Sequence, residues 1–178
     1  MAFLPDNYEP PQAGRYFKPQ PGENKIRLMT DAIIGTVGWK DSEDGGRKPH
    51  RAKAGDPLPE GCEDPKHFWA VGIWDMADSQ IKVWEITQTS IRDALMALIN
   101  DPDWGDPRNY GIKIHKSGAG MDTKYNVVAA PKQPASDEML QALSEARLDL
   151  NALYSGGDPF GVEMVGNAAT EEEDDVPF

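Results

Sequence analysis

The hairpin that decides the fold reads KHFWAVGIWDM over residues 66–76 and QIKVWEIT over residues 80–87. Aromatic and β-branched residues dominate both runs, and the polar turn Ala77-Asp78-Ser79 between them is typical of two antiparallel strands. In the first run both alternating sets of side chains are apolar, so at least one set must be buried. In the second run Lys82 and Trp84 share one face. These runs predict the central hairpin of a β-rich core.

Further strand-like runs flank this hairpin. Residues 14–19 (GRYFKP) predict a short strand, residues 24–37 (NKIRLMTDAIIGTV) a long strand, and residues 109–116 and 122–130 a second hairpin around the sequence SGAG. Thr89 or Ser90 can cap a helix over residues 91–99, and Ser136 can cap an amphipathic helix that reaches about Tyr154. We predict a mainly β protein: an OB-fold-like small barrel of five or six strands with one intervening helix and a C-terminal helix. An open β-sandwich is the alternative.

Charge divides the chain into a nearly neutral body and an acidic end. The 178 residues carry a net charge of −12, but residues 137–178 hold 11 acidic residues and a single basic one. Residues 1–136 therefore carry only −2, which leaves room for a local basic surface in an acidic protein. We expect an extended segment over 1–13, one domain over 14–135 with a long loop at 39–65, a helix over 136–154 and a disordered acidic tail over 155–178.

Cysteine content and hydropathy bear on the compartment. Cys62 is the only cysteine, so no disulfide can form within the chain, and a reducing compartment is favoured. No apolar run approaches the roughly 18 residues of a membrane helix, and the start MAFLPDNYEPP has neither the basic nor the apolar part of a signal peptide. We expect a cytoplasmic protein with no membrane partner, in the host cytoplasm if a phage encodes it.

Motifs for catalysis are missing from the sequence. It contains no Gly-x-Ser-x-Gly, no P-loop and no His-Glu-x-x-His, so we expect neither an enzyme nor a cofactor. His50, Cys62 and His67 lie in or beside one insertion and have zinc-binding side chains, but a structural zinc site needs four closely spaced ligands. We therefore predict no metal site.

Aromatic and cationic residues alternate along the predicted strands. Single-stranded nucleic acid needs cations for its phosphates and aromatic faces for its bases. The insertion adds four cations within seven residues, without an acid among them. Any one of the hairpin tryptophans can instead be a core residue; of these, Trp84 beside Lys82 is the favoured DNA-facing residue. The predicted binding residues are Lys25, Arg27, Trp39, Lys40, Arg47, Lys48, Arg51, Lys53, Trp69, Trp74, Lys82, Trp84, Tyr110, Lys113, Lys116, Lys124 and Tyr125.

The last eight residues read EEEDDVPF. Five consecutive carboxylates cannot enter a core without a large desolvation cost, so this segment is expected in water. Its apolar end suits capture by a partner's hydrophobic pocket with a basic rim. A solubility-promoting acidic tail is the plainer interpretation. The predicted partner-binding residues are Asp174, Asp175, Val176, Pro177 and Phe178.

Both the body and the end resemble a known family. The stretches RYFKPQPGENKIRLM, FWAVGIWD, IKVWEITQTSI and NYGIKIHKSGAGMDTKYNV follow the layout of bacteriophage single-stranded DNA-binding proteins. The ending resembles the Asp-aliphatic-Pro-Phe tails of bacterial and phage single-stranded DNA-binding proteins. The resemblance covers residues 14–131 and the tail. Some phage relatives carry a zinc-binding insertion with several Cys and His, but this insertion has one Cys, so zinc does not carry over.

The resemblance implies a protein that coats single-stranded DNA with little sequence preference in replication, recombination or repair. It implies that the tail recruits replication and recombination proteins, and the tail can also cover the basic groove when DNA is absent. A monomer and a dimer are both open. The alternative hypothesis is an OB-fold adaptor that binds protein and no nucleic acid.

Overall fold

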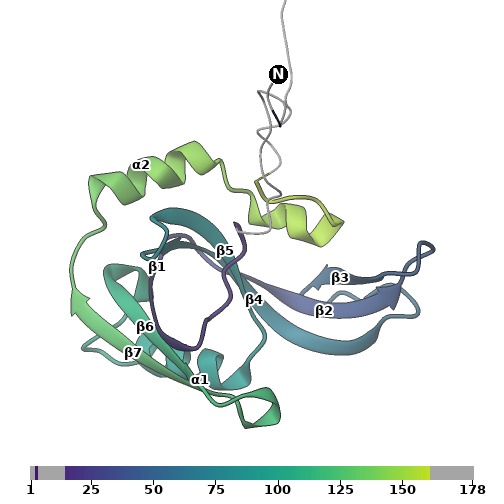
Figure 1. Ribbon diagram of the computed structural model, residues 1–178, viewed down its shortest axis with the longest axis horizontal. Coiled ribbons are helices and arrows are strands. Elements are labelled where there is room, and N and C mark those ends of the chain that lie inside the picture. Colours follow the sequence, from purple (N-terminus) through teal and green to yellow (C-terminus); the bar gives the residue numbers. More distant parts are fainter. Residues whose placement is uncertain (1–2, 4–14, 161–178) are drawn as a thin grey trace, which may run out of the picture.

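Strand β4 (Glu63–Asp75) is 13 residues long and joins two parts of one antiparallel sheet. In the computed structural model, which describes residues 3 and 15–160, its first half pairs with β2 (Ile33–Asp41). Its second half pairs with β1 (Gly22–Leu28) on one side and β5 (Gln80–Ile86) on the other. The first half of β4 therefore belongs to a projecting arm and the second half to a barrel (Figure 1).

The barrel has the strand order expected of an OB-fold-like protein. Helix α1 (Thr89–Ile99) follows β5, and a hairpin of β6 (Tyr110–Ser117) and β7 (Lys124–Lys132) comes next. Strand β1 pairs with both β4 and β6, so it links the two hairpins into one curved sheet. The prediction of a mainly β, OB-fold-like barrel with one helix between its hairpins is confirmed.

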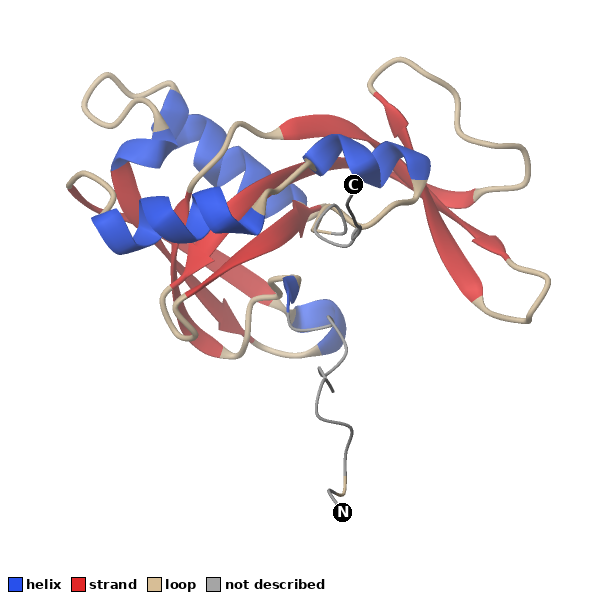
Figure 2. Cartoon of the chain, turned by 90° about the horizontal axis from the view of Figure 1, so that it is seen from above, coloured by secondary structure: helices blue, strands red, loops and turns tan. Residues whose placement is uncertain are grey.

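The arm occupies the region predicted to be a long loop. Strand β3 (Arg47–Lys53) pairs with β2, which in turn pairs with β4. Together they form a three-stranded sheet that projects from the barrel (Figure 2). The loop prediction for residues 39–65 is wrong for these strands, because charged residues lie on an exposed two-sided sheet as readily as in a loop. The described sheet has seven strands instead of five or six.

Other predicted elements are corrected at their ends. The long strand expected over 24–37 breaks at residues 29–32, where the chain leaves the barrel for the arm and Met29 N–H donates to the Gly72 carbonyl (2.8 Å). Tyr16 forms an isolated β-bridge with Val83, and residues 15–19 contain no strand beyond that bridge. Gln88, not Thr89 or Ser90, precedes the first turn of α1.

The C-terminal helix is shorter than predicted. Ser136 caps α2 (Asp137–Ala146) by accepting from Met139 N–H, as expected, but the helix ends at Arg147 in a left-handed conformation. Short 3-10 turns follow, including η4 (Leu150–Ser155), whose Leu150 and Leu153 are buried. The predicted segment 1–13, apart from Phe3, and residues 161–178 lie outside the described residues. Of the tail predicted over 155–178, residues 155–160 are described, and Phe160 is buried instead of disordered.

Two apolar clusters lie on opposite faces of the β4–β5 hairpin. One fills the barrel and includes Val71, Ile73 and Trp84. The other lies outside the barrel, where Ala70 and Val83 pack beneath α2 and η4. Both apolar faces of the KHFWAVGIWDM run are therefore buried, which explains why that run shows no alternation with polar residues.

Candidate nucleic-acid interface

Several residues predicted to stack on bases are core residues. Trp84 is 1% exposed and Trp74 is 4% exposed, while Tyr110 is fully buried. Trp84 packs edge-to-face on Phe17 (5.4 Å between ring centroids) inside the barrel, and Trp74 lies in the outer cluster under α2. Their side chains cannot reach a strand on the surface in this structure. The prediction that they stack on bases is wrong, because the face shared by Lys82 and Trp84 turns inward.

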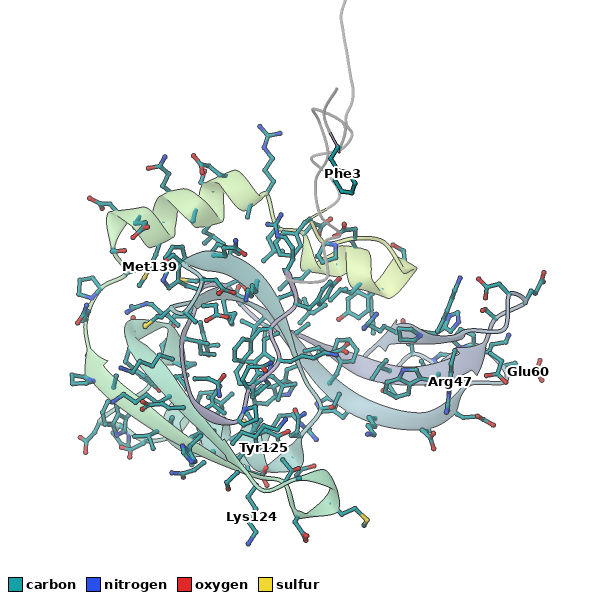
Figure 3. All side chains as sticks on the ribbon, in the orientation of Figure 1. Phe3, Arg47, Glu60, Lys124, Tyr125 and Met139 are labelled. Atoms are coloured by element: carbon teal, nitrogen blue, oxygen red, sulfur yellow. The ribbon has the colours of Figure 1, made fainter. Side chains whose placement is uncertain are left out.

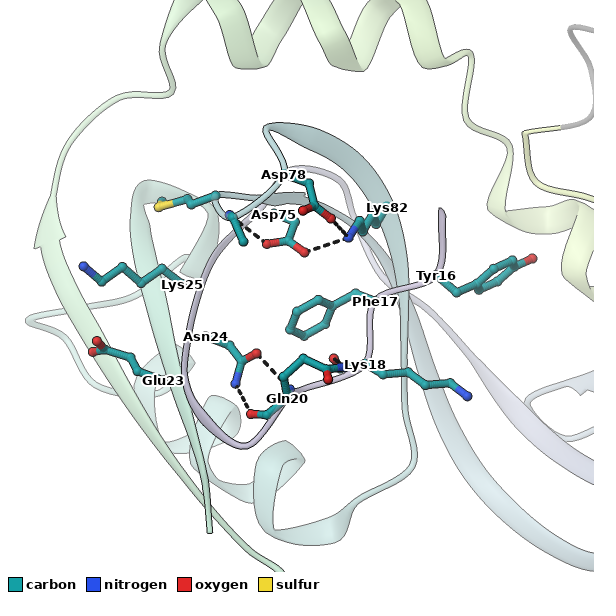
Figure 4. A pocket seen from close by; sticks show the side chains of 12 residues that line it. Tyr16, Phe17, Lys18, Gln20, Glu23, Asn24, Lys25, Asp75, Asp78 and Lys82 are labelled. Carbon is teal, nitrogen blue, oxygen red and sulfur yellow. Dashed lines mark hydrogen bonds and ion pairs between the residues drawn. The ribbon is translucent and has the colours of Figure 1, made fainter. Parts of the chain in front are cut away.

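Lys82 is held by carboxylates at the end of the barrel. Its Nζ is 2.9 Å from Asp75 Oδ2 and also pairs with Asp78, and the lysine is 8% exposed. Burial alone would lower the pKa of Lys82, but hydrogen bonds to Asp78 and Asp75 and their charges raise it. This ion pair lines a cavity of about 730 Å³, which Figure 4 shows enclosed by the segment that runs from Tyr16 to Lys25. Lys82 is therefore a structural cation and not a free phosphate contact.

One face of the arm gathers aromatic and cationic side chains. The pairing of β2 with β3 sets Trp39 opposite Pro49 and Val37 opposite Arg51, and the pairing with β4 sets Val37 opposite Lys66. Residues directly opposite in an antiparallel pair lie on the same face of the sheet. We call this face the arm face; its members are Trp39, Arg47, Arg51, Lys53 and Lys66.

The arm face includes a partly exposed tryptophan, Trp39. Lys66 Nζ lies 5.9 Å from the Trp39 ring, within cation–π range. Trp39, Arg47 and Lys66, with Asp64 and Pro65, line a hollow of about 630 Å³. An exposed indole face beside an ammonium group offers a base a stacking surface and a phosphate a counter-charge.

Acidic residues neutralise part of the arm face. Arg47 pairs with Glu63 (3.3 Å) and Asp64 (2.9 Å), and Arg51 makes a two-pronged contact with Glu85. The lysines carry no such ion pair among residues 15–160: Lys53 lies 5.8 Å from the Tyr154 ring, and Lys66 lies over Trp39. Lys53 and Lys66 are therefore the cations of this face that are available to an incoming phosphate.

Tyr16 and Tyr154 extend the arm face and were missed in the sequence. Figure 4 shows Tyr16 and Lys18 pointing away from the cavity that their segment encloses. Burial raises the pKa of the Tyr16 hydroxyl, and Asp158 raises it further while Arg51 opposes this effect, which places Tyr16 beside Arg51. Tyr154 donates to the Ile34 carbonyl (2.6 Å). The sequence predicts Tyr16 in a short strand and Tyr154 at the end of a helix, so nothing in it places either tyrosine beside the strands of the arm.

The opposite face of the arm carries Lys40 and Lys48, which lie directly opposite one another. The connection between β3 and β4 crosses this face: Leu58 and Cys62 lie 2.8 and 3.1 Å from where a Cβ on Gly38 would stand. This face is therefore partly covered. Within the described residues, His50, Cys62 and His67 belong to no group of three or more possible metal ligands.

The outer surface of β1, β6 and β7 is a second cationic area. Lys25 is exposed and lies opposite Lys113, and Lys124 points away from the protein at one end of β7 (Figure 3). Lys116 and Tyr125 lie opposite each other on the other face of this hairpin, where Tyr125 packs against the barrel core and Lys116 Nζ is 3.5 Å from the Pro19 carbonyl. Arg27, on the same strand as Lys25, is only 5% exposed. Its side chain is thus largely buried and borders a cavity, whereas Lys25 on the same face is open to solvent.

Trp69 is partly buried between the barrel and α1. It packs against the barrel core and borders a mostly apolar cavity of about 470 Å³ with Leu28, Ile86 and Leu95. Polar groups at its rim, Asp31 and Arg108, pair with each other. Trp69 lies on the opposite sheet face from Trp39, so the two tryptophans do not form one stacking row.

In a plain OB-fold, the face of the second and third barrel strands binds oligonucleotides together with the first and fourth connections. In this protein the second and third barrel strands are β4 and β5, and their outer face is covered. Here α2 and η4 cover the outer face of these two strands. The arm stands where the first connection would be, between β1 and β4. The sheet face that η4 covers continues along β4 onto the arm. There it is the arm face, and it is open.

The chain is similar to a distant relative among known proteins. The chain is 24% identical over 112 residues to a protein named probable ssDNA-binding protein from Escherichia phage T5. The match covers 63% of this chain and 40% of the relative, so the chain spans well under half of that protein's length. No family model matches the chain, and no solved structure matches it. In the described part of the chain, no helix is long and apolar enough to cross a membrane.

Proposed function

We propose that this protein binds single-stranded DNA through the arm face, with little preference for sequence. The observation that carries the proposal is the placement of partly exposed Trp39 with Lys66 and Arg47 around one hollow of an open sheet face. Aromatic stacking accepts any base, and ammonium groups follow the phosphates, so this arrangement suits binding without base readout. The distant similarity to a probable ssDNA-binding protein of phage T5 supports the same proposal.

Fluorescence titration with poly(dT) at low and high salt tests the proposal. Stacking on Trp39 should quench part of the tryptophan emission, and higher salt should weaken binding as counterion release predicts. Trp39→Phe is the matched variant, because it keeps an aromatic face and removes one emitting indole. Duplex DNA of equal length is the control ligand. Absence of poly(dT) binding at low salt would favour the OB-fold adaptor that binds protein.

The acidic end is proposed to recruit proteins of replication, recombination or repair. Residues Glu171 to Phe178 combine five carboxylates with an apolar Val-Pro-Phe sequence, which suits a hydrophobic pocket with a basic rim. Phe178→Ala should abolish partner capture and leave poly(dT) affinity nearly unchanged, because it removes no charged side chain. A pull-down with wild type and Phe178→Ala compares the two. Equal recovery of replication proteins by both would remove the recruitment role.

The carboxylates of the same segment are proposed to compete with DNA phosphates for the body's cations. Deleting Glu171 to Phe178 should tighten poly(dT) binding, most at low salt, because added ions screen the competition. A deletion that leaves affinity unchanged at every salt concentration would show that the segment does not cover the binding surface.

A further inference from the structure

Among the described residues, Arg27 is a buried cation without a counter-charge. Its Nη2 donates to the Arg108 carbonyl (2.7 Å), but its Nε has no hydrogen-bond partner in residues 15–160. Within residues 15–160, no carboxylate forms an ion pair with it, and burial lowers its pKa. Burying a guanidinium without an anion costs several kcal/mol, so its presence is hard to explain by stability alone.

The side chain borders a cavity of about 350 Å³ between β1 and the segment that leads into α2. The other lining residues are apolar or neutral apart from Arg108, whose guanidinium pairs with Asp106 and Asp31. Asp137 and Glu138 stand in the first turn of α2, yet neither lines the cavity. The space beside Arg27 is therefore positive and free of carboxylates among its lining residues.

Arg27 continues the cationic area on the outer face of the barrel. Lys25 precedes it by two residues on β1 and shares its face, about 7 Å away along the strand. Lys113 lies directly opposite Lys25 on β6. Two like charges opposite each other destabilise a sheet, and Glu23, with its carboxylate 4.0 Å from Lys113, is a distant counter-charge.

We infer that Arg27, Lys25 and Lys113 bind neighbouring phosphates of a DNA strand on the outer face of β1 and β6. This surface is separate from the arm face, so one molecule would hold a longer strand at two places. The inference rests on the proposed single-stranded DNA binding. A row of cations at strand spacing favours a phosphate backbone over a single carboxylate group. The contacts are to phosphates alone, since the exposed large side chains on this part of the sheet are Met76 and Val128.

Inorganic phosphate probes the Arg27 site without DNA. The full-length protein should gain thermal stability from millimolar phosphate at constant ionic strength, and Arg27→Met should lose that gain. In phosphate-free buffer Arg27→Met should unfold at the same temperature as wild type or higher, because it removes an uncompensated buried charge. An equal phosphate response in both proteins would overturn the site.

Oligo(dT) of increasing length tests the second surface. Short oligomers that fill only the arm face should bind wild type and the exposed pair Lys25→Gln/Lys113→Gln alike. For long oligomers, each lost phosphate contact should reduce the slope of log K against log salt by about 0.7. Arg147→Gln, which removes one exposed charge from the end of α2, is the matched control. If Arg27→Met fails to fold, the Lys25→Gln/Lys113→Gln variant still tests the second surface.

The outcomes separate the two proposals. Failure of wild type to bind oligo(dT) at any length would overturn the proposed function itself. Normal binding with no length-dependent difference between wild type and the paired variant would overturn only the second surface.

Discussion

The barrel and the arm contain similar combinations of tryptophan and basic residues but use them differently. In the barrel, Trp84 and Lys82 share a strand face that turns into the core, and the lysine is neutralised by Asp75 and Asp78. On the arm, Trp39 and Lys66 share a face that stays open. The same pairing of residue types is thus structural where helices and strands enclose it and available to a ligand where they do not.

The largest effect in this comparison is expected at Trp84. Trp84→Ala should destabilise the protein by about 4 kcal/mol, because it leaves a large cavity in the barrel core. Urea unfolding followed by circular dichroism measures the loss. Trp39→Ala is the matched arm variant and should cost far less. A fully stable Trp84→Ala protein with weakened DNA binding would reverse the assignment of these two tryptophans.

Lys82→Met should cost about 3 kcal/mol, because it leaves Asp75 buried without its cation. The raised pKa of Lys82 also gives a pH test. The stabilisation by this lysine is fully present below its ordinary pKa of 10.5 and is lost as the pH rises through the higher folded value. The difference in unfolding free energy between wild type and Lys82→Met should therefore stay constant from pH 8 to about pH 10.5 and shrink at higher pH. A difference that does not shrink at the higher pH would argue against a charged pair.

On the arm, Trp39→Ala should weaken poly(dT) binding by about 1–3 kcal/mol, the usual value of one base stacked on an aromatic ring. Fluorescence anisotropy with labelled oligo(dT) measures the change, and the unfolding midpoint shows whether the arm is intact. Trp69→Phe serves as a comparison on the opposite sheet face. If Trp69→Phe weakens binding while Trp39→Ala does not, the DNA lies on the α1 side of the sheet.

The smallest effect concerns the two faces of the arm. Lys53→Gln/Lys66→Gln should lower the slope of log K against log salt by about 1.4, as two lost phosphate contacts predict for a single strand. Lys40→Gln/Lys48→Gln removes the same charge from the partly covered face and should lower it less. Equal slopes for the two pairs would mean that the arm acts through its net charge and not through one face.

The hairpins, the helix between them and the OB-fold-like class can be predicted from the sequence, because strand alternation and turn residues are local signals. The sequence identified Trp39, Arg47, Arg51 and Lys53 as candidates but not Lys66, and it could not separate them from Trp84 and Lys82. Alternation tells which residues share a face, whereas burial depends on what packs against that face. Only the tertiary structure decided that α2 and η4 cover the outer face of β4 and β5. It also showed that the charged insertion forms a sheet and that Arg27 is buried without an anion, since both depend on segments far apart in the chain.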